Sequence, residues 1–466
     1  MRAPAPTNLR RAPALAGLVA AVACEPAPRP PASPTPPAAD QLPASAGPIA
    51  GPTPRPRTRA AVRSCPASGK PAPVDLDPRI TLGEVAGATW LFGYASEGAV
   101  LARLDRSGGL AKLKVPLDDA QAGAIDGDTI YLYASRRGDD APTRWLTVDA
   151  GDPDAPRLGA VEALQVGARV DYAVGLGVGA ERALVITGHI DARELVVLDR
   201  RTRSAVAPPH PLGEGFLPVH TSCDRDRCAV IGVADEGGGP ARRLVVIRAL
   251  ADGTREQEQL APGWIGQPHA AELGDSVIVA WPADGGLYLR ALDRWGRPRG
   301  AAVKQAQPDV PPGREALLHA DGAVALAIGG RDGWSFAPVA ADATVGKFLK
   351  ISAARRSFLL GAPLDDGLAW IDVGGDVDYS QLGDSGAWIH SWRSAVSAGF
   401  VPASGAPPVH HDITAGGGGG RGGFDPHMLV RPGTASALVV PRGDADGLEQ
   451  TVIAPLRIPC GRSSGE

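Results

Sequence analysis

The chain has 466 residues, a formal net charge of −4 and an isoelectric point near 6.2. This balance excludes the basic surface of a nucleic-acid-binding protein. Beyond the N-terminal leader, no apolar stretch approaches the length that crosses a bilayer. We therefore expect no nucleic-acid partner, and we expect any membrane contact to come from the N-terminus alone.

The N-terminus carries an export signal. Three arginines (Arg2, Arg10 and Arg11) accompany an apolar run from Ala12 to Ala23, which ends in Ala21-Val22-Ala23 directly before Cys24. The pattern resembles a bacterial lipoprotein signal, although a leucine is more usual where Ala21 stands. The resemblance implies removal of residues 1–23, lipid on Cys24, and a place in the cell envelope, at the outer membrane or cell surface. The same residues also fit ordinary secretory cleavage, which would give a soluble periplasmic or secreted protein.

Residues 24–75 are rich in proline and alanine and contain scarcely any large apolar residue. Such a composition cannot form a hydrophobic core. Proline-rich chain favours the extended polyproline conformation, which rises about 3.1 Å per residue. We expect a disordered linker that holds the folded part away from the membrane.

From Ile80 onward, short apolar runs recur, mostly 40 to 54 residues apart. Alternating apolarity predicts strands, and glycine with aspartate supplies the turns. No sustained helical pattern follows the leader. The runs begin at Ala88, Asp128, Arg182, Cys228, Asp275, Gly322, Arg356 and Ala437.

This spacing is that of a four-stranded propeller blade. The stretch from Ala280 to Gly300, with Leu287-Tyr-Leu-Arg-Ala-Leu-Asp293-Arg-Trp-Gly296 at its centre, resembles blade repeats of secreted bacterial β-propellers. We expect an all-β chain with a single β-propeller of seven or eight four-stranded blades over residues 76–460, followed by a disordered tail at 461–466. The unit from Arg356 is irregular, and residues 381–421 have the character of an insertion.

If Cys24 carries lipid, four cysteines remain. Cys223 and Cys228 flank a polar turn between two predicted strands, so a disulfide across the hairpin is sterically easy. Cys65 and Cys460 then pair by elimination and would fasten the two ends of the ring. The alternative is a zinc site, but the spacing lacks paired Cys-x-x-Cys units.

Three histidines, His220, His269 and His319, lie in successive units, 49 and 50 residues apart. Each precedes the apolar run of its unit, where the innermost strand of a blade is expected. Neutral imidazoles around one channel could bind a metal or an anion, although their distances to the following run differ. We expect ligand-binding histidines or ordinary strand residues here, and we assign no cofactor and no metal.

Two further segments carry residues of catalytic or ligating type. His410, His411, Asp412 and His427 bracket a polyglycine run, but without a recognised ligand spacing. Gly383-Asp384-Ser385-Gly386 matches the tetrapeptide around a serine-protease nucleophile, but no histidine motif of that family precedes it, which favours a turn. Gly175-x-Gly177-x-Gly179 lacks the spacing of a dinucleotide-binding loop and is interpreted as a turn.

These observations together favour a monomeric, lipid-anchored propeller that binds a protein or glycan partner at the cell envelope, with no catalysis. The rival function is a propeller enzyme, a glycan or ester hydrolase or lyase acting at the mouth of the channel. No linear motif in the chain decides between the two.

Overall fold

A computed structural model describes residues 64–67, 70–105, 107–117, 120–134, 143–164, 173–188, 193–235, 242–249, 255–261, 265–283, 286–305, 315–320, 322–330, 333–351, 358–382, 387–413, 423–442 and 450–460. All regular elements in these residues are β-strands. The described residues contain no helix of the length and apolarity that would span a membrane.

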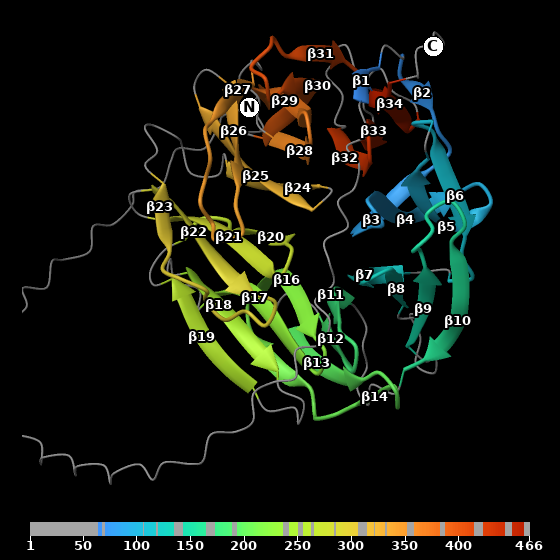
Figure 1. Cartoon of the computed structure of the whole chain (residues 1–466), viewed down its shortest axis with the longest axis vertical. Coiled ribbons are helices and arrows are strands. Elements are labelled where there is room, and N and C mark those ends of the chain that lie inside the picture. The colour runs from blue at the N-terminus through green and yellow to red at the C-terminus, as the bar shows by residue number, and fades with distance from the viewer. Residues whose placement is uncertain are drawn as a thin grey trace, which may run out of the picture. The chain divides into compact units, whose positions relative to one another are not determined.

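The first four sheets follow one another along the chain, each antiparallel (Figure 1). Blade 1 contains β3 (Asp77–Val85), β4 (Ala88–Ala95), β5 (Gly98–Leu104) and β6 (Leu110–Lys114). Blade 2 contains β7 (Ala120–Asp126), β8 (Thr129–Ala134), β9 (Arg144–Asp149) and β10 (Arg157–Ala163). Blade 3 contains β11 (Ala173–Val178), β12 (Arg182–Thr187), β13 (Arg193–Asp199), β14 (Ser204–Ala205) and β15 (His210–Gly213). Blade 4 contains β16 (Leu217–Asp224), β17 (Arg227–Asp235), β18 (Arg242–Ala249) and β19 (Arg255–Ala261).

The remaining sheets continue the same order. Blade 5 contains β20 (His269–Leu273), β21 (Ser276–Ala283), β22 (Gly286–Asp293) and β23 (Val303–Gln305). Blade 6 contains β24 (Glu315–Ala320), β25 (Ala323–Gly330), β26 (Gly333–Val339) and β27 (Leu349–Ile351). Blade 7 contains β28 (Phe358–Leu364), β29 (Gly367–Leu382), β30 (Ala387–Pro402) and β31 (Val409–Asp412). Blade 8 contains β32 (Gly423–Arg431), β33 (Thr434–Arg442) and β34 (Val452–Pro459), with β1 (Ser64–Pro66) and β2 (Ala72–Pro73) paired to β34.

The eight sheets form a closed ring. The first strand of each blade contacts the first strand of the next, so these strands lie innermost around a central channel (Figure 1). The protein is therefore an eight-bladed β-propeller, which confirms the expected fold class and settles the blade number at the larger value. We name the two faces by their connections. The turn face carries the turns after the first and third strands of a blade, and the loop face carries the other connections.

The hydrophobic core is divided among the junctions between blades. The described residues form eight apolar clusters, each at a junction between neighbouring blades, and the cluster between blades 7 and 8 also includes Ala320 of blade 6. In β8, Ile130 and Leu132 pack toward blade 1, whereas Tyr131 and Tyr133 pack toward blade 3. Because successive side chains of a strand point to opposite faces, a strand buried on both faces is a continuous apolar run. This explains why the second strands have unbroken apolar sequences.

The N-terminal strands β1 and β2 close the ring. Ser64 pairs with Pro459 and Cys65 with Ile458, so residues from the start of the described chain form the outer edge of the last blade. The Cys65–Cys460 disulfide links the same two ends. Strand pairing thus begins at Ser64, which lies within the range 24–75 that we expected to be linker. The cause is the open edge of β34, which offers backbone hydrogen bonds to these residues.

The second disulfide joins Cys223 and Cys228, which are direct partners in the β16–β17 ladder. The structure therefore contains both pairs that the spacing of the cysteines suggested. Disulfides of this kind persist in oxidising compartments.

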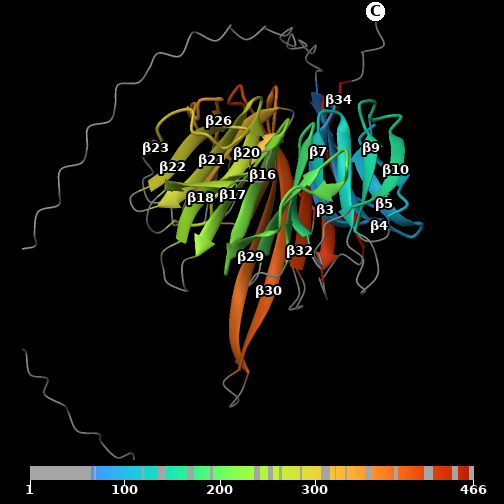
Figure 2. The ribbon, with the colours of Figure 1, turned by 90° about the horizontal axis from the view of Figure 1, so that it is seen from below.

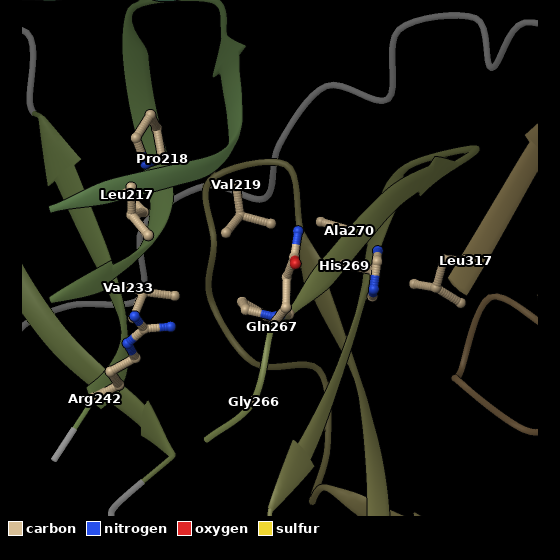
Figure 3. Close-up of a pocket in the computed structure, with 11 residues that line it drawn as sticks. Leu217, Pro218, Val219, Val233, Arg242, Gly266, Gln267, His269, Ala270 and Leu317 are labelled. Atoms are coloured by element: carbon tan, nitrogen blue, oxygen red, sulfur yellow. The ribbon is translucent and has the colours of Figure 1, made fainter. Parts of the chain in front are cut away.

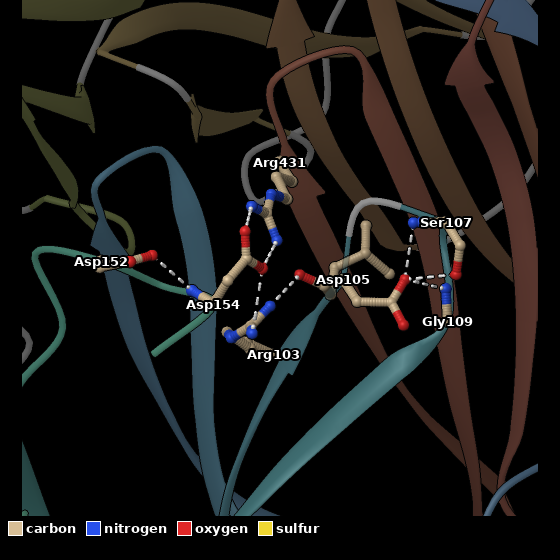
Figure 4. A network of polar contacts seen from close by, with 8 residues as sticks. Arg103, Asp105, Ser107, Gly109, Asp152, Asp154 and Arg431 are labelled. Atoms are coloured by element: carbon tan, nitrogen blue, oxygen red, sulfur yellow. Dashed lines mark hydrogen bonds and ion pairs between the residues drawn. The ribbon is translucent and has the colours of Figure 1, made fainter. Parts of the chain in front are cut away.

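A charged clasp crosses the junction where the ring closes (Figure 4). Asp154, in the turn between β9 and β10 of blade 2, accepts two hydrogen bonds of 2.9 Å from the guanidinium of Arg431 at the end of β32 in blade 8. Its Oδ1 also lies 3.3 Å from Nη2 of Arg103 on β5 in blade 1. Both arginines are buried, so one carboxylate joins three blades.

Blade 7 departs from the common pattern. The ladder between β29 and β30 continues to Leu382 and Ala387, and this hairpin projects beyond the other strands on the loop face (Figure 2). The run from Arg356 is therefore the innermost strand β28, whereas the other apolar runs are second strands, which accounts for the irregular spacing. Residues 383–386 lie outside the described residues. The interpretation of Gly175 and Gly177 as a turn is wrong, because both lie in the innermost strand β11.

Candidate functional site

The channel widens into a cavity of about 570 Å³ toward the turn face. Its walls come from the innermost strands of blades 1 to 6 and from the turn after β22. Blades 1 to 3 contribute mostly small and apolar residues together with two carboxylates, whereas blades 4 to 6 contribute most of the polar side chains. The polar residues of this lining are Glu84, Asp126, His220, Thr221, Ser222, Cys223, Glu272, Arg294 and His319.

Glu272 on β20 is the centre of the polar side. One carboxylate oxygen lies 3.4 Å from Nε2 of His220 on β16, and the other lies 3.8 Å from Nη2 of Arg294. Arg294 also donates a hydrogen bond of 3.3 Å to the carbonyl oxygen of Gly274, and its own carbonyl accepts a hydrogen bond from Ser222 Oγ at 2.5 Å. The carboxylate is thus held between blade 4 and the turn of blade 5.

The charge state of the cluster follows from its geometry. Burial by itself would raise the pKa of Glu272, but the hydrogen bond with His220 and the positive charge of Arg294 bring that pKa below its ordinary value. Burial lowers the pKa of His319, although the nearby Glu272 opposes the shift. At neutral pH the site therefore presents an ionised carboxylate, a guanidinium and a neutral His319. It can both donate and accept hydrogen bonds.

The alternation of side chains along a strand explains why a histidine meets a glutamate here. His220 lies four residues before Asp224, the end of β16, and Glu272 lies one residue before Leu273, the end of β20. Side chains an even number and an odd number of residues from the end of a strand point to opposite sides of the blade. His220 of blade 4 and Glu272 of blade 5 therefore point toward each other. The regular spacing of histidines in the sequence therefore gives no indication of Glu272 or Arg294. Arg294 does lie in the turn of the stretch that resembles a blade repeat.

The three predicted histidines all lie on innermost strands, but they do not form one cluster. His220 and His319 line the channel cavity, whereas His269, at the start of β20, lines a different cavity toward the loop face (Figure 3). Burial lowers the pKa of His269, which keeps this imidazole neutral at neutral pH. Sequence spacing placed these residues in the correct strands without showing which of them meet.

The residues around the polyglycine run also separate. His410 and Asp412 lie on β31, the outermost strand of blade 7, whereas His427 lies on β32, the innermost strand of blade 8. Nδ1 of His427 is 3.2 Å from Oγ1 of Thr81 on β3, which links blades 8 and 1. Residues 414–422 lie outside the described part of the chain. Within the described part, no group of three or more histidine, cysteine, aspartate or glutamate residues could hold a metal ion.

Glycine gives the apolar side of the cavity its shape. A Cβ atom on Gly123 of β7 would lie 2.0 Å from Cδ2 of Leu82 on β3. A Cβ atom on Gly179 would lie 2.9 Å from both the carbonyl oxygen of Arg225 and Cβ of Cys223. At Gly179 the backbone of the neighbouring blade leaves no room for a side chain, whereas at Gly123 a side chain would require Leu82 to move.

No protein-family model and no curated protein matches the chain. Solved structures match it in fold. The β-propeller domain of the Trilobed protease from Pyrococcus furiosus shares 8% identity, with a TM-score of 0.40 over 74% of this chain and 97% of that one. AztD from Citrobacter koseri shares 13% identity, with a TM-score of 0.40 over 77% and 95%. Hydrazine synthase from Kuenenia stuttgartiensis shares 11% identity, with a TM-score of 0.39 over 65% and 95%. At these identities and TM-scores the likeness carries no argument about function.

Proposed function

We propose that the protein is an exported, lipid-anchored propeller that binds a glycan at the turn-face end of its channel. Export and attachment through Cys24 are supported by the leader sequence and its resemblance to a lipoprotein signal. The two disulfides support an oxidising destination. Substitution Cys24→Ser is expected to move the protein from the membrane fraction to the soluble fraction, and a membrane fraction that retains the variant would argue against the anchor.

The observation that carries the binding proposal is the ionised Glu272 carboxylate held between His220 and Arg294 in the channel cavity. A carboxylate accepts hydrogen bonds from sugar hydroxyls, and a guanidinium donates to sugar oxygens. The cavity volume of about 570 Å³ lies in the ordinary range for ligand sites. Because the groups come from adjacent rigid blades, little ordering is needed when a ligand binds.

Glycan hydrolysis is the second candidate, because three acids and two histidines line one mouth of the channel. A glycosidase needs a carboxylic acid that stays protonated at the working pH, which requires a raised pKa. The partners of Glu272 lower its pKa instead. This carboxyl group is therefore suited to accepting hydrogen bonds from a sugar and poorly suited to the acid role in hydrolysis, and we propose binding on that ground.

The test is calorimetric titration of the mature protein with a panel of bacterial envelope glycans, with products analysed by mass spectrometry. We expect at least one glycan to bind without cleavage and Glu272→Gln to weaken binding about tenfold or more. The control is Glu258→Gln on the outermost strand β19, which pairs with Arg248 away from the channel. Cleavage of the glycan would favour the enzyme, and equal affinities of the two variants would refute the site.

A further inference from the structure

A second cavity, of about 490 Å³, lies toward the loop face between blades 4, 5 and 6. It adjoins the channel cavity, since Val219 and Ala270 line both, but its chemistry differs. Seven of its eleven lining residues are apolar, and polar groups lie between them. The apolar side chains come from Leu217, Pro218, Val219, Val233, Pro268, Ala270 and Leu317.

Three polar side chains interrupt this apolar wall. Figure 3 shows Arg242 beside Val233 at one end, Gln267 in the middle and His269 beside Leu317 at the other end. Among the described residues that line the cavity, Arg242 is the only charged one. Because burial keeps His269 neutral, its ring offers one donor and one acceptor and adds no second positive charge. The described lining therefore presents a single cation among mostly apolar residues.

The backbone around Gly266 supports this cavity. The N–H of Gly266 donates a hydrogen bond of 2.9 Å to the carbonyl oxygen of Pro282 on β21. A Cβ atom at position 266 would lie 2.4 Å from Cγ of Pro282. Only glycine allows this close approach, which holds Gln267 and His269 against the blade and at the edge of the cavity.

We infer that this cavity is a second binding site, separate from the proposed glycan site, and that it takes an aliphatic carboxylate. The planar guanidinium of Arg242 matches a carboxylate in a paired hydrogen-bond geometry. One formal positive charge suits a monoanion better than a phosphate dianion. The carboxylate would lie at the Arg242 end, within reach of the Gln267 amide in the middle, and the aliphatic chain would extend along Val219 toward Leu317.

Two sources can supply this chemistry: a free medium-chain acid, or the carboxyl terminus of a peptide that ends in an aliphatic residue. The experiment titrates the mature protein with octanoate and, separately, with acetyl-Ala-Ala-Leu that has a free carboxylate. Binding of octanoate supports the free acid as the source, and binding of the peptide alone supports a protein terminus. Failure of both to bind at millimolar concentration overturns the inference.

Matched ligands and variants isolate each contribution. Hexanoate lacks two methylenes of octanoate and is expected to bind about fourfold more weakly for each of them. Octanamide is also expected to bind more weakly than octanoate, because it lacks the negative charge. Arg242→Gln is expected to weaken octanoate about tenfold while leaving octanamide unchanged. Leu317→Gln is expected to weaken both ligands alike. Circular dichroism checks that each variant is folded.

The control is Arg243→Gln, which removes the next arginine on β18, a residue outside the cavity lining. It is expected to leave octanoate affinity unchanged. Glu272→Gln is also expected to leave it unchanged, so failure of the glycan site and failure of this site give different results. Equal affinities for octanoate and octanamide, or an Arg242→Gln variant that binds octanoate as well as the wild type, would exclude carboxylate recognition.

Discussion

Removal of the Asp154 carboxylate tests whether the charged clasp holds the ring junction. In Asp154→Ala, the buried guanidinium groups of Arg103 and Arg431 lose the carboxylate that joins them. Breaking a fully buried ion pair costs roughly 3–5 kcal/mol. The side chain of Asp154 is 37% exposed, so water replaces part of the interaction. We expect the free energy of unfolding to fall by about 2 kcal/mol.

The assay is equilibrium urea denaturation followed by tryptophan fluorescence, with the shift of the midpoint compared at constant slope. The matched control is Asp342→Ala in the equivalent turn of blade 6, where the carboxylate accepts a hydrogen bond from the Thr344 N–H and no arginine contact is found among the described residues. We expect a smaller loss there, of about 1 kcal/mol or less.

A double-mutant cycle with Arg431→Met then measures the coupling between Asp154 and Arg431. Replacing the arginine should destabilise the wild type more than it destabilises Asp154→Ala, because the variant has already lost the ion pair. Equal effects of Arg431→Met in the two backgrounds would refute the reasoning, as would a loss in Asp154→Ala no larger than in the control.

Two further predictions concern stability. The double substitution C65S/C460S is expected to lower the free energy of unfolding by about 6 kcal/mol, and C223S/C228S by about 2 kcal/mol. The reason is that the two disulfides close loops of 395 and 5 residues, and the chain-entropy model assigns the larger stabilisation to the longer loop. Urea midpoints that fall equally in the two variants would contradict this account. Burial lowers the folded-state pKa of His269 and His319 below the unfolded value of 6.5, so the folded state binds fewer protons than the unfolded state just below that pH. Stability should therefore be greatest above pH 6.5 and fall as the pH drops below it, and the double variant H269Q/H319Q should flatten this dependence; an unchanged difference between urea midpoints at pH 7.5 and pH 5.5 would contradict the assignment.

The repeating architecture was predictable from the amino-acid sequence alone. Each blade buries its second strand on both faces, so the chain must repeat short apolar runs separated by glycine and aspartate turns. Cys223 and Cys228 were predictable as a pair because only a tight turn separates them. The pairing of Cys65 with Cys460 was inferred by elimination. The ring explains this pairing, since the two ends of the propeller meet in blade 8.

Which polar groups meet depends on how the blades pack against one another. His220 contacts Glu272 because neighbouring blades face each other through positions of opposite parity, and a bulge between Pro218 and His220 shifts the register of β16. His269 lies at a position that looks equivalent in the sequence, yet it lines another cavity. Asp154 reaches Arg431 across 277 residues of sequence because ring closure places blade 8 beside blade 1, and the turn of blade 2 that carries Asp154 extends to the same junction. Local pattern specifies which residues are buried in a strand, whereas contacts between blades depend on register and ring closure, which no short segment encodes.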